Sequence, residues 1–420
     1  MNTQIIICFL LLAFDIVMFM TEKIKPATTA IITAVVLALT KVLTPQEAFS
    51  GFINGSVLLF VGMFVISGAL FKTGMAHKIA NLIISRIKSE RNMIFVVFLF
   101  CGILSAFLPN LGTCAVMMPI IIGVAETSGY KRSRLLMAMI YGSTVGGTAT
   151  LIGTVGNTTI AEMIKDITGN PVGFFEFTKI GGPMLVAGAI MFYFWGDKIL
   201  PGREAPQDYL IQQTDYSHVP PWKQWTSLCV LVTVVLCIIF DVGYDLYLIA
   251  AAGGLFLLIT GIISEDEAIS SIQWKTIFLV AGMLPMSTAL NNTGAGAMIA
   301  NTIVKLCGNS KSPLFLTAVI WIICNLLTQI ISNTATTMLM APIGIAIAET
   351  LQASPVGVLM AVLIGSSCAF MTPIGQGGNT MIFDVGGYKF SDYIKSGWQI
   401  TLLCFIVSMI SLSLFFPFFG

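Results

Sequence analysis

Charged side chains are scarce in this chain of 420 residues: Asp, Glu, Lys and Arg together account for 10% of it. Because a soluble domain has about 25% charged residues, this scarcity excludes an ordinary soluble protein. With 56% hydrophobic residues, the composition indicates a polytopic membrane protein. The net charge is only +1, so the chain lacks the basic excess of nucleic-acid-binding proteins, and no nucleic-acid partner is expected.

Common metal-binding and catalytic patterns are also missing. The nine cysteines include no CxxC pair, which argues against a disulfide framework or a zinc site. There is no HExxH motif, and no histidine or acidic pair falls at membrane depth, so an intramembrane enzyme is not expected. No basic region precedes the first apolar run, so this run is predicted to be a retained first helix rather than a signal peptide.

Apolar runs predict the membrane spans. We place these spans near 3–20, 27–44, 54–72, 135–164 (broken), 180–199, 224–241, 246–263, 274–291, 355–384 (broken) and 397–417. Two more segments, 92–125 and 312–348, carry no charge and are too long for one membrane helix of roughly 20 residues. Small polar residues interrupt both near their middles. Because such a break at membrane depth must be buried or line a polar cavity, we predict two re-entrant hairpins.

The distribution of basic residues predicts the orientation. If both termini face outward, sixteen of the 21 Lys and Arg residues fall on the cytoplasmic side, as membrane proteins prefer. Basic clusters flank the first hairpin at both ends, at 72–91 and 131–134, which fits a segment that enters and leaves on the cytoplasmic face. The prediction is therefore a multi-pass protein of the cell inner (plasma) membrane with both termini extracytoplasmic.

The two halves of the chain resemble each other at an offset of about 220 residues. Residues 44–47 match 264–267, Thr73-Gly74 matches Thr293-Gly294, and Asn110 matches Asn333. Each half has five crossings and one hairpin, and an odd number of crossings turns the second copy upside down. We predict an all-α polytopic membrane protein with a first inverted repeat at 1–200, a cytoplasmic linker at 201–223 and a second inverted repeat at 224–420.

Four polar breaks in symmetric positions form the candidate site. They are the hairpin tips at 109–113 and 332–336, and the interruptions of the broken spans at 147–157 and 371–379. A broken helix exposes carbonyl groups at one end and N–H groups at the other. Carbonyl and Asn oxygens suit a dehydrated cation such as Na⁺, whereas N–H groups and hydroxyls suit a carboxylate or oxyanion. The breaks therefore suit a site for both a cation and an anion.

These motifs resemble the divalent anion/sodium symporter family of the ion-transporter superfamily. Ser332-Asn333-Thr334 is similar to the hairpin signature of that family, and residues 147–153 and 370–375 are similar to its two broken helices. The segment 386–393 is similar to the one that follows in members. The resemblance covers nearly the whole chain. It implies an elevator-type secondary transporter in the lipid bilayer, commonly a homodimer, that moves dicarboxylates, citrate or sulfate with Na⁺.

The resemblance also implies functional residues. One Na⁺ site would be lined by Ser105, Asn110 and Gly153, and the other by Thr328, Asn333 and Gly375. The resemblance further implies anion contacts from Asn110, Ser332 and Thr334. With the polar breaks added, the predicted substrate-binding set is Asn110, Gly112, Thr113, Thr154, Ser332, Asn333, Thr334, Gln376 and Gly377. Asn157 and Asn379 are predicted to support these residues.

The first hairpin departs from the family pattern, because it reads Pro109-Asn110-Leu111 and so lacks one expected hydroxyl. The leading hypothesis is sodium-coupled symport of a di- or tricarboxylate by alternating access. The same scaffold class also suits an anion exchanger, an oxyanion efflux permease or a sodium/proton antiporter, although an antiporter would want a carboxylate within the motifs.

Three titratable residues outside these motifs are candidates for a functional role. Asp15 is the one acidic residue well inside an apolar run, and we interpret it as a structural or dimer contact, with protonation as the alternative. His77 and His218 are predicted to lie in loops.

Overall fold

The computed structural model describes residues 3–84, 87, 89–204, 216, 218–306 and 312–417, and its regular secondary structure over these residues is entirely helical. Within these described residues, five helices are long and apolar enough to cross a membrane. The predicted all-α class is therefore confirmed. Most of the predicted linker 201–223 lies outside the described residues, namely 205–215 and 217.

The helices follow one another along the chain from near the N-terminus to near the C-terminus. They are α1 (Thr3–Thr21), α2 (Pro26–Leu39), α3 (Pro45–Ala48), η1 (Ser50–Ile53), α4 (Gly55–Lys72), α5 (Met75–Ile84), α6 (Glu90–Ser105), α7 (Asn110–Ser128), α8 (Arg132–Gly147), α9 (Val155–Thr168), α10 (Thr178–Ile199), α11 (Pro221–Ile239), α12 (Leu246–Ile259), α13 (Glu265–Ser271), α14 (Trp274–Thr293), α15 (Ala295–Leu306), α16 (Pro313–Thr328), α17 (Asn333–Thr350), α18 (Pro355–Ser367), α19 (Gly377–Phe383) and α20 (Phe390–Phe415).

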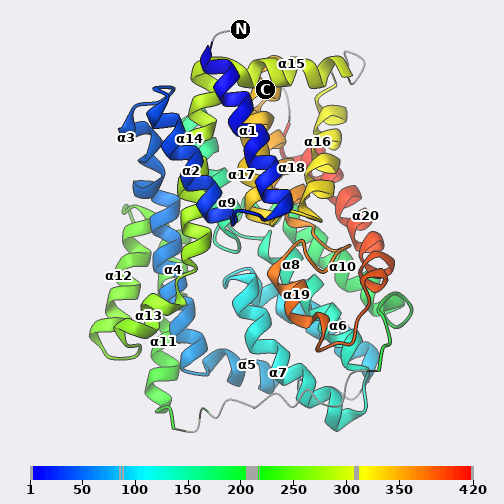
Figure 1. The fold of residues 1–420 in the computed structure, drawn as a ribbon. Helices are drawn as coiled ribbons and strands as arrows, with labels where there is room; N and C mark the ends of the chain where they lie inside the picture. The colour runs from blue at the N-terminus through cyan, green and yellow to red at the C-terminus, as the bar shows by residue number, and fades with distance from the viewer. Residues whose placement is uncertain are drawn as a thin grey trace.

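Each of the four predicted breaks separates two consecutive helices in the structure. The two hairpin segments form α6 with α7 and α16 with α17, and the two broken spans form α8 with α9 and α18 with α19. The same order of elements recurs in the two halves of the chain. Figure 1 shows the N- and C-terminal ends at the same end of the molecule. The inverted relation of the halves, the entry of the hairpins from one membrane face and the side on which the termini lie stay predictions.

The structure contains two lateral helices where the sequence analysis expected loops. α5 follows Gly74 and α15 follows Gly294, and these two glycines have φ angles of +76° and +77°. Glycine adopts this left-handed backbone without steric cost, so the chain can turn sharply out of the preceding helix and begin a new one. His77 consequently lies on α5 and not in a loop, so that prediction was wrong, whereas His218 lies in a turn.

A matched pair of short helices, α3 and α13, explains another part of the sequence repeat. The Thr44 and Ser264 side chains accept hydrogen bonds from the backbone N–H groups of Glu47 and Glu267, and each glutamate side chain accepts one from the backbone N–H of its partner. These reciprocal bonds form capping boxes, which satisfy otherwise unpaired N–H groups at a helix start. The repeated segments 44–47 and 264–267 therefore specify the same local structure.

The helices pack in two groups that lie side by side (Figure 1). The first group contains α2, α4, α11, α12 and α14, and the second contains α6, α8, α10, α16, α18 and α20. The second group is held by glycine contacts: a Cβ on Gly142 would overlap the Phe98 carbonyl, and one on Gly146 would overlap Gly102. α6 and α8 thus touch through their backbones, which small residues permit in membrane proteins.

Asp15 is fully buried on α1, where its carboxylate accepts a hydrogen bond from the Thr33 hydroxyl of α2 at 2.5 Å. This contact fits the structural interpretation of Asp15. The alternatives of a dimer contact and of protonation stay open.

Candidate functional site

A cavity of about 200 Å³ lies where the two hairpin tips meet the two broken helices. Its lining residues come from α4, α7, α8, α9, α14, α17 and α19, and from the residues just before five of these helices. They are Phe60, Phe64, Pro109, Asn110, Leu111, Cys114, Ser143, Thr144, Gly153, Thr154, Val155, Gln273, Thr276, Ser332, Asn333, Thr334, Gln376, Gly377 and Gly378. Two halves of the chain that are far apart in sequence therefore build one compartment, as the pairing of breaks predicted.

Three long helices begin at this cavity. α7 starts at Asn110, α9 at Val155 and α17 at Asn333, and each of these first residues lines the cavity. The first N–H groups of a helix lack intrahelical partners and carry its positive dipole end, so they attract an anion. No Asp, Glu, Lys, Arg or His occurs among the described residues that line the cavity. Attraction for an anion would therefore come from these backbone dipoles rather than from charged side chains.

Hydroxyl and amide groups of the first half form a cluster behind the tip of the first hairpin. The Ser105 hydroxyl donates to the Asn110 side-chain oxygen at 2.5 Å. The Ser143 hydroxyl is within hydrogen-bond distance of both the Ser105 hydroxyl (3.1 Å) and the Asn110 carbonyl (3.3 Å). A Cβ on Gly147 would overlap the Asn110 side-chain oxygen, so the end of α8 lies directly against this group. The cluster concentrates oxygen ligands of the type that Na⁺ prefers.

The second half builds a similar cluster at its own hairpin. The Thr328 hydroxyl is 2.8 Å from the Asn333 side-chain oxygen and 2.5 Å from the Ser366 carbonyl oxygen. The Asn333 amide donates to the Ser367 carbonyl at 3.2 Å. A Cβ on Gly375 would overlap the Thr328 carbonyl, which places the second break against the end of α16.

Two buried asparagines brace the breaks. The Asn157 amide donates to the carbonyls of Gly147 and Thr150 at 2.8 and 2.6 Å. The Asn379 amide donates to the carbonyls of Ala369 and Thr372 at 2.8 and 2.7 Å. Each asparagine therefore ties the start of one half-helix to the unwound chain before it, and this geometry fits the supporting role predicted for both.

Not every residue of the predicted site reaches the cavity. Gly112 lies beside it, against the Phe71 ring, and Thr113 is completely buried with its hydroxyl lacking a partner among the described residues. Ser105, Thr328 and Gly375 are also absent from the lining, but they touch Asn110, Asn333 or each other directly behind it. The remaining predicted substrate residues and Gly153 line the cavity.

Sequence reasoning missed several lining residues. Ser143 and Thr144 lie on α8 just before its break, and their position two helical turns or less from Gly147 was an available signal. Gln273 and Thr276 come from the start of α14, and no motif in the sequence pointed to them.

A wider vestibule of about 700 Å³ adjoins the cavity. Phe64, Pro109, Leu111 and Gln273 line both spaces, so the two are neighbours with a common wall. The vestibule lies at the end of the molecule where α5 and α7 are found, opposite the two termini (Figure 1). His77 of α5 lines this vestibule. Its partial burial lowers the pKa of the imidazole and so favours the neutral form.

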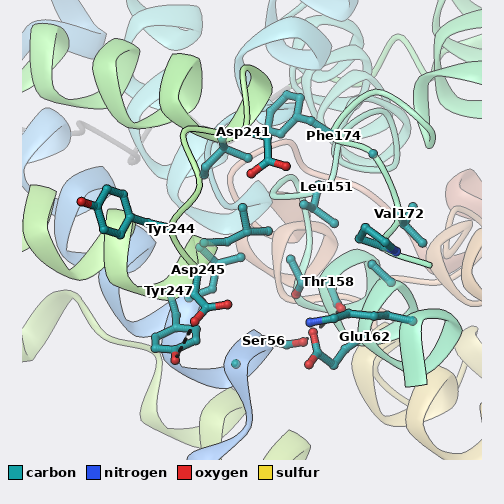
Figure 2. Close-up of a pocket in the computed structure, with 18 of the residues that line it drawn as sticks. Ser56, Leu151, Thr158, Glu162, Val172, Phe174, Asp241, Tyr244, Asp245 and Tyr247 are labelled. Carbon is teal, nitrogen blue, oxygen red and sulfur yellow. Dashed lines mark hydrogen bonds between the residues drawn. The ribbon is translucent and has the colours of Figure 1, made fainter. Parts of the chain in front are cut away.

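Figure 2 shows another cavity, of about 390 Å³, between α4, α9 and the turn that joins α11 to α12. Three carboxylates line it, from Glu162, Asp241 and Asp245, with Lys165 as the one cationic side chain among the described lining residues. The Tyr247 hydroxyl donates to Asp245 at 3.2 Å. An excess of negative charge repels an anion, so we assign the candidate site to the cavity at the hairpin tips.

Known transporters resemble this chain over most of its length. The profile of the citrate transporter family matches residues 16–363 and 298–419. A transporter of Haemophilus influenzae is 24% identical, covering 94% of this chain and 89% of that protein. The sodium-dependent dicarboxylate transporter SdcS of Staphylococcus saprophyticus is also 24% identical, covering 93% of this chain and 82% of its own length.

A solved structure is similar in fold. MtrF of Neisseria gonorrhoeae, described as illuminating a class of antimetabolite efflux pumps, superposes with a TM-score of 0.64 over 90% of this chain and 83% of its own. The identity is 15%, so this likeness shows the fold alone.

Proposed function

The chain belongs to the citrate transporter family, and we propose that it is a secondary active transporter that moves a small di- or tricarboxylate together with Na⁺ by alternating access. The family and the relatives are transporters and not enzymes, and the chain is a multi-pass membrane protein. The anion, the coupling ion and the mechanism belong to the proposal.

The observation that carries the proposal is the composition of the cavity at the hairpin tips. Three helix N-termini, the Ser332 and Thr334 side chains and the Asn110 amide converge there without a charged residue among the described lining groups. Neutral donors compensate a carboxylate but hold it less tightly than an arginine would, and a transporter must release its cargo.

Sodium coupling is supported by the two oxygen clusters. Each combines a hydroxyl, an asparagine side-chain oxygen and nearby carbonyls, and each lies directly behind a residue that lines the cavity. Na⁺ bound there would place positive charge close to the anion, so binding of either would favour binding of the other. The relative SdcS is named as sodium-dependent, which favours Na⁺ as the coupling ion.

One alternative function on this scaffold fits less well. A sodium/proton antiporter needs a titratable carboxylate in the site, and the described lining of the cavity has none. An anion exchanger or an oxyanion efflux permease would use the same anion-binding groups, so these two differ from the proposal only in coupling and direction.

The proposal includes the setting of the protein. We place it in the plasma membrane as a homodimer with both termini extracytoplasmic. In that orientation the vestibule opens to the cytoplasm, because α5 and α7 lie at the end opposite the termini (Figure 1).

Thermal stability of the purified protein tests the proposal. It would be measured in Na⁺, K⁺ and choline, each with dicarboxylates, citrate, sulfate or arsenite, because a ligand stabilises the folded state that binds it. A Na⁺-specific rise that one carboxylate deepens is expected. Asn110→Ala and Asn333→Ala should lose this response and transport while remaining folded, whereas Asn292→Ala, at an exposed position late in α14, should keep both. Stabilisation by anions without any Na⁺ preference would refute the coupling.

A further inference from the structure

We infer that Gln273 is a substrate-contacting residue that binds the anion only while the vestibule is open. This inference rests on the proposed function and adds to it a residue that lies outside the hairpins and the broken helices. The geometry that points to Gln273 is its place on the wall shared by the cavity and the vestibule.

Gln273 belongs to the first packing group. It precedes α14, which packs against α2 and η1. Two close approaches fix this helix, because a Cβ on Gly282 would overlap Ala30 and one on Gly51 would overlap the Ala281 carbonyl. α14 therefore cannot shift relative to α2 without breaking backbone contacts.

The hairpin tips and the breaks belong mainly to the other packing group. α7 and α8 pack together, α17 packs on α18, and α9 packs on both α17 and α18. Gln273 and Thr276 are thus the polar groups that reach the cavity from the first group, beside the apolar rings of Phe60 and Phe64. The two groups also touch, because α14 packs on α17 and α4 packs on α9, so the anion would lie at the seam where the groups meet.

The Gln273 side chain has donor capacity to spare. Its oxygen accepts a hydrogen bond from the Thr276 hydroxyl at 3.4 Å, and its Nε2 group has no partner among the described residues. This interaction orients the amide with its N–H groups available to a ligand. A carboxylate in the cavity would accept one of them, and a hydrogen bond to a charged group is stronger than one between neutral groups.

The two packing groups determine from which side of the membrane Gln273 can contact the anion. In alternating access, one group of helices moves relative to the other so that the bound anion faces the opposite side of the membrane. The hairpin tips would carry the anion away from Gln273, because this residue stays with α14. The contact therefore strengthens binding from the vestibule side and contributes nothing from the other side.

The experiment compares transport from the two sides in right-side-out and inside-out membrane vesicles, using the carboxylate that stabilises the wild type most. Gln273→Ala should raise the half-saturating anion concentration on the vestibule side about tenfold, since a hydrogen bond to a charged group is worth somewhat more than one decade in affinity. Gln273→Glu, which is nearly isosteric and adds a negative charge, should raise it further. The other side should be unchanged in both variants. Gln46→Ala, at an exposed position on α3, is the matched control.

Each outcome is informative. If the wild type neither binds nor moves any carboxylate, the proposed function fails, and this inference with it. If the wild type transports and Gln273→Ala matches it on both sides, the function stands and the inference is overturned. An equal loss on both sides would overturn the state-specific contact as well. Retained stabilisation of each variant by Na⁺ alone shows that it is folded.

Discussion

The brace formed by Asn157 gives the sharpest test of how the breaks are held. Asn157 is completely buried, and its amide donates to the carbonyls of Gly147 and Thr150, which lie before the start of α9. Asn157→Ala removes both hydrogen bonds and leaves two buried acceptors short of a partner. Each loss costs about 1–2 kcal/mol, so the free energy of unfolding should fall by roughly 2–4 kcal/mol.

The assay is equilibrium unfolding of the purified protein in detergent, followed by intrinsic fluorescence. Asn379→Ala should lose a similar amount, because Asn379 makes the same two bonds to Ala369 and Thr372 at nearly equal distances. Asn170→Ala, in an exposed loop, is the control and should change little. Wild-type stability and transport in Asn157→Ala would refute the idea that these amides hold the unwound segments in place.

Three more predictions follow from particular contacts. Gly142→Ala drives a methyl group into the Phe98 carbonyl, so this variant should be less stable by ~3 kcal/mol or should not fold. Gly254→Ala, whose Cβ would lie 3.4 Å from Val65, should be tolerated, and equal expression and melting temperature of the two variants would contradict the contact. Leu111→Thr restores the missing hydroxyl at the cavity and should lower the half-saturating concentration of a dicarboxylate about tenfold relative to Leu111→Val, which has the same shape without the donor. No difference in uptake between these two variants would count against an anion contact at residue 111. A hydrogen bond from the Ser264 backbone N–H holds the pKa of the Glu267 carboxyl below its usual 4.5. The stability that this carboxylate supplies is therefore complete above pH 4.5 and disappears as the pH falls through the lowered pKa, so the melting temperature of Glu267→Gln should depend less on pH in that range; identical pH curves would argue against the capping box.

The sequence predicted the spans and the four breaks well because their signals are local. A charge-free run interrupted by Asn, Thr, Gly and Pro can satisfy its backbone only inside the protein, and the structure interrupts its helices at each such place. The lateral helices α5 and α15 were missed because their apolar residues cover one face only. A search for continuous apolar runs long enough to span a membrane passes over such segments and leaves them as loops.

The site was predicted in part for a similar reason. Asn110, Asn333 and Gln376 belong to recognisable breaks and do line the cavity, whereas Gln273 is an isolated glutamine whose role depends on how α14 packs against a distant part of the chain. Thr113 was predicted to bind the substrate from its place in the sequence motif, but the structure buries it away from the cavity. Its place one turn into α7 rotates it away from the tip and into the protein, although it is adjacent to the tip in sequence.

The lack of ionisable carboxylates and cations in the cavity has a consequence for how acidity acts on the protein. Cys114 is the one side chain with an exchangeable acidic proton among the described lining residues, and thiols stay protonated at neutral pH. Changing the proton concentration across the physiological range would therefore alter the cargo and leave the compartment untouched. A citrate or dicarboxylate molecule would present itself in different charge forms while the groups that line the cavity keep theirs, so the pH dependence of anion binding would report the ionisation state that is bound, once the titration of His77 in the adjoining vestibule is removed by substitution.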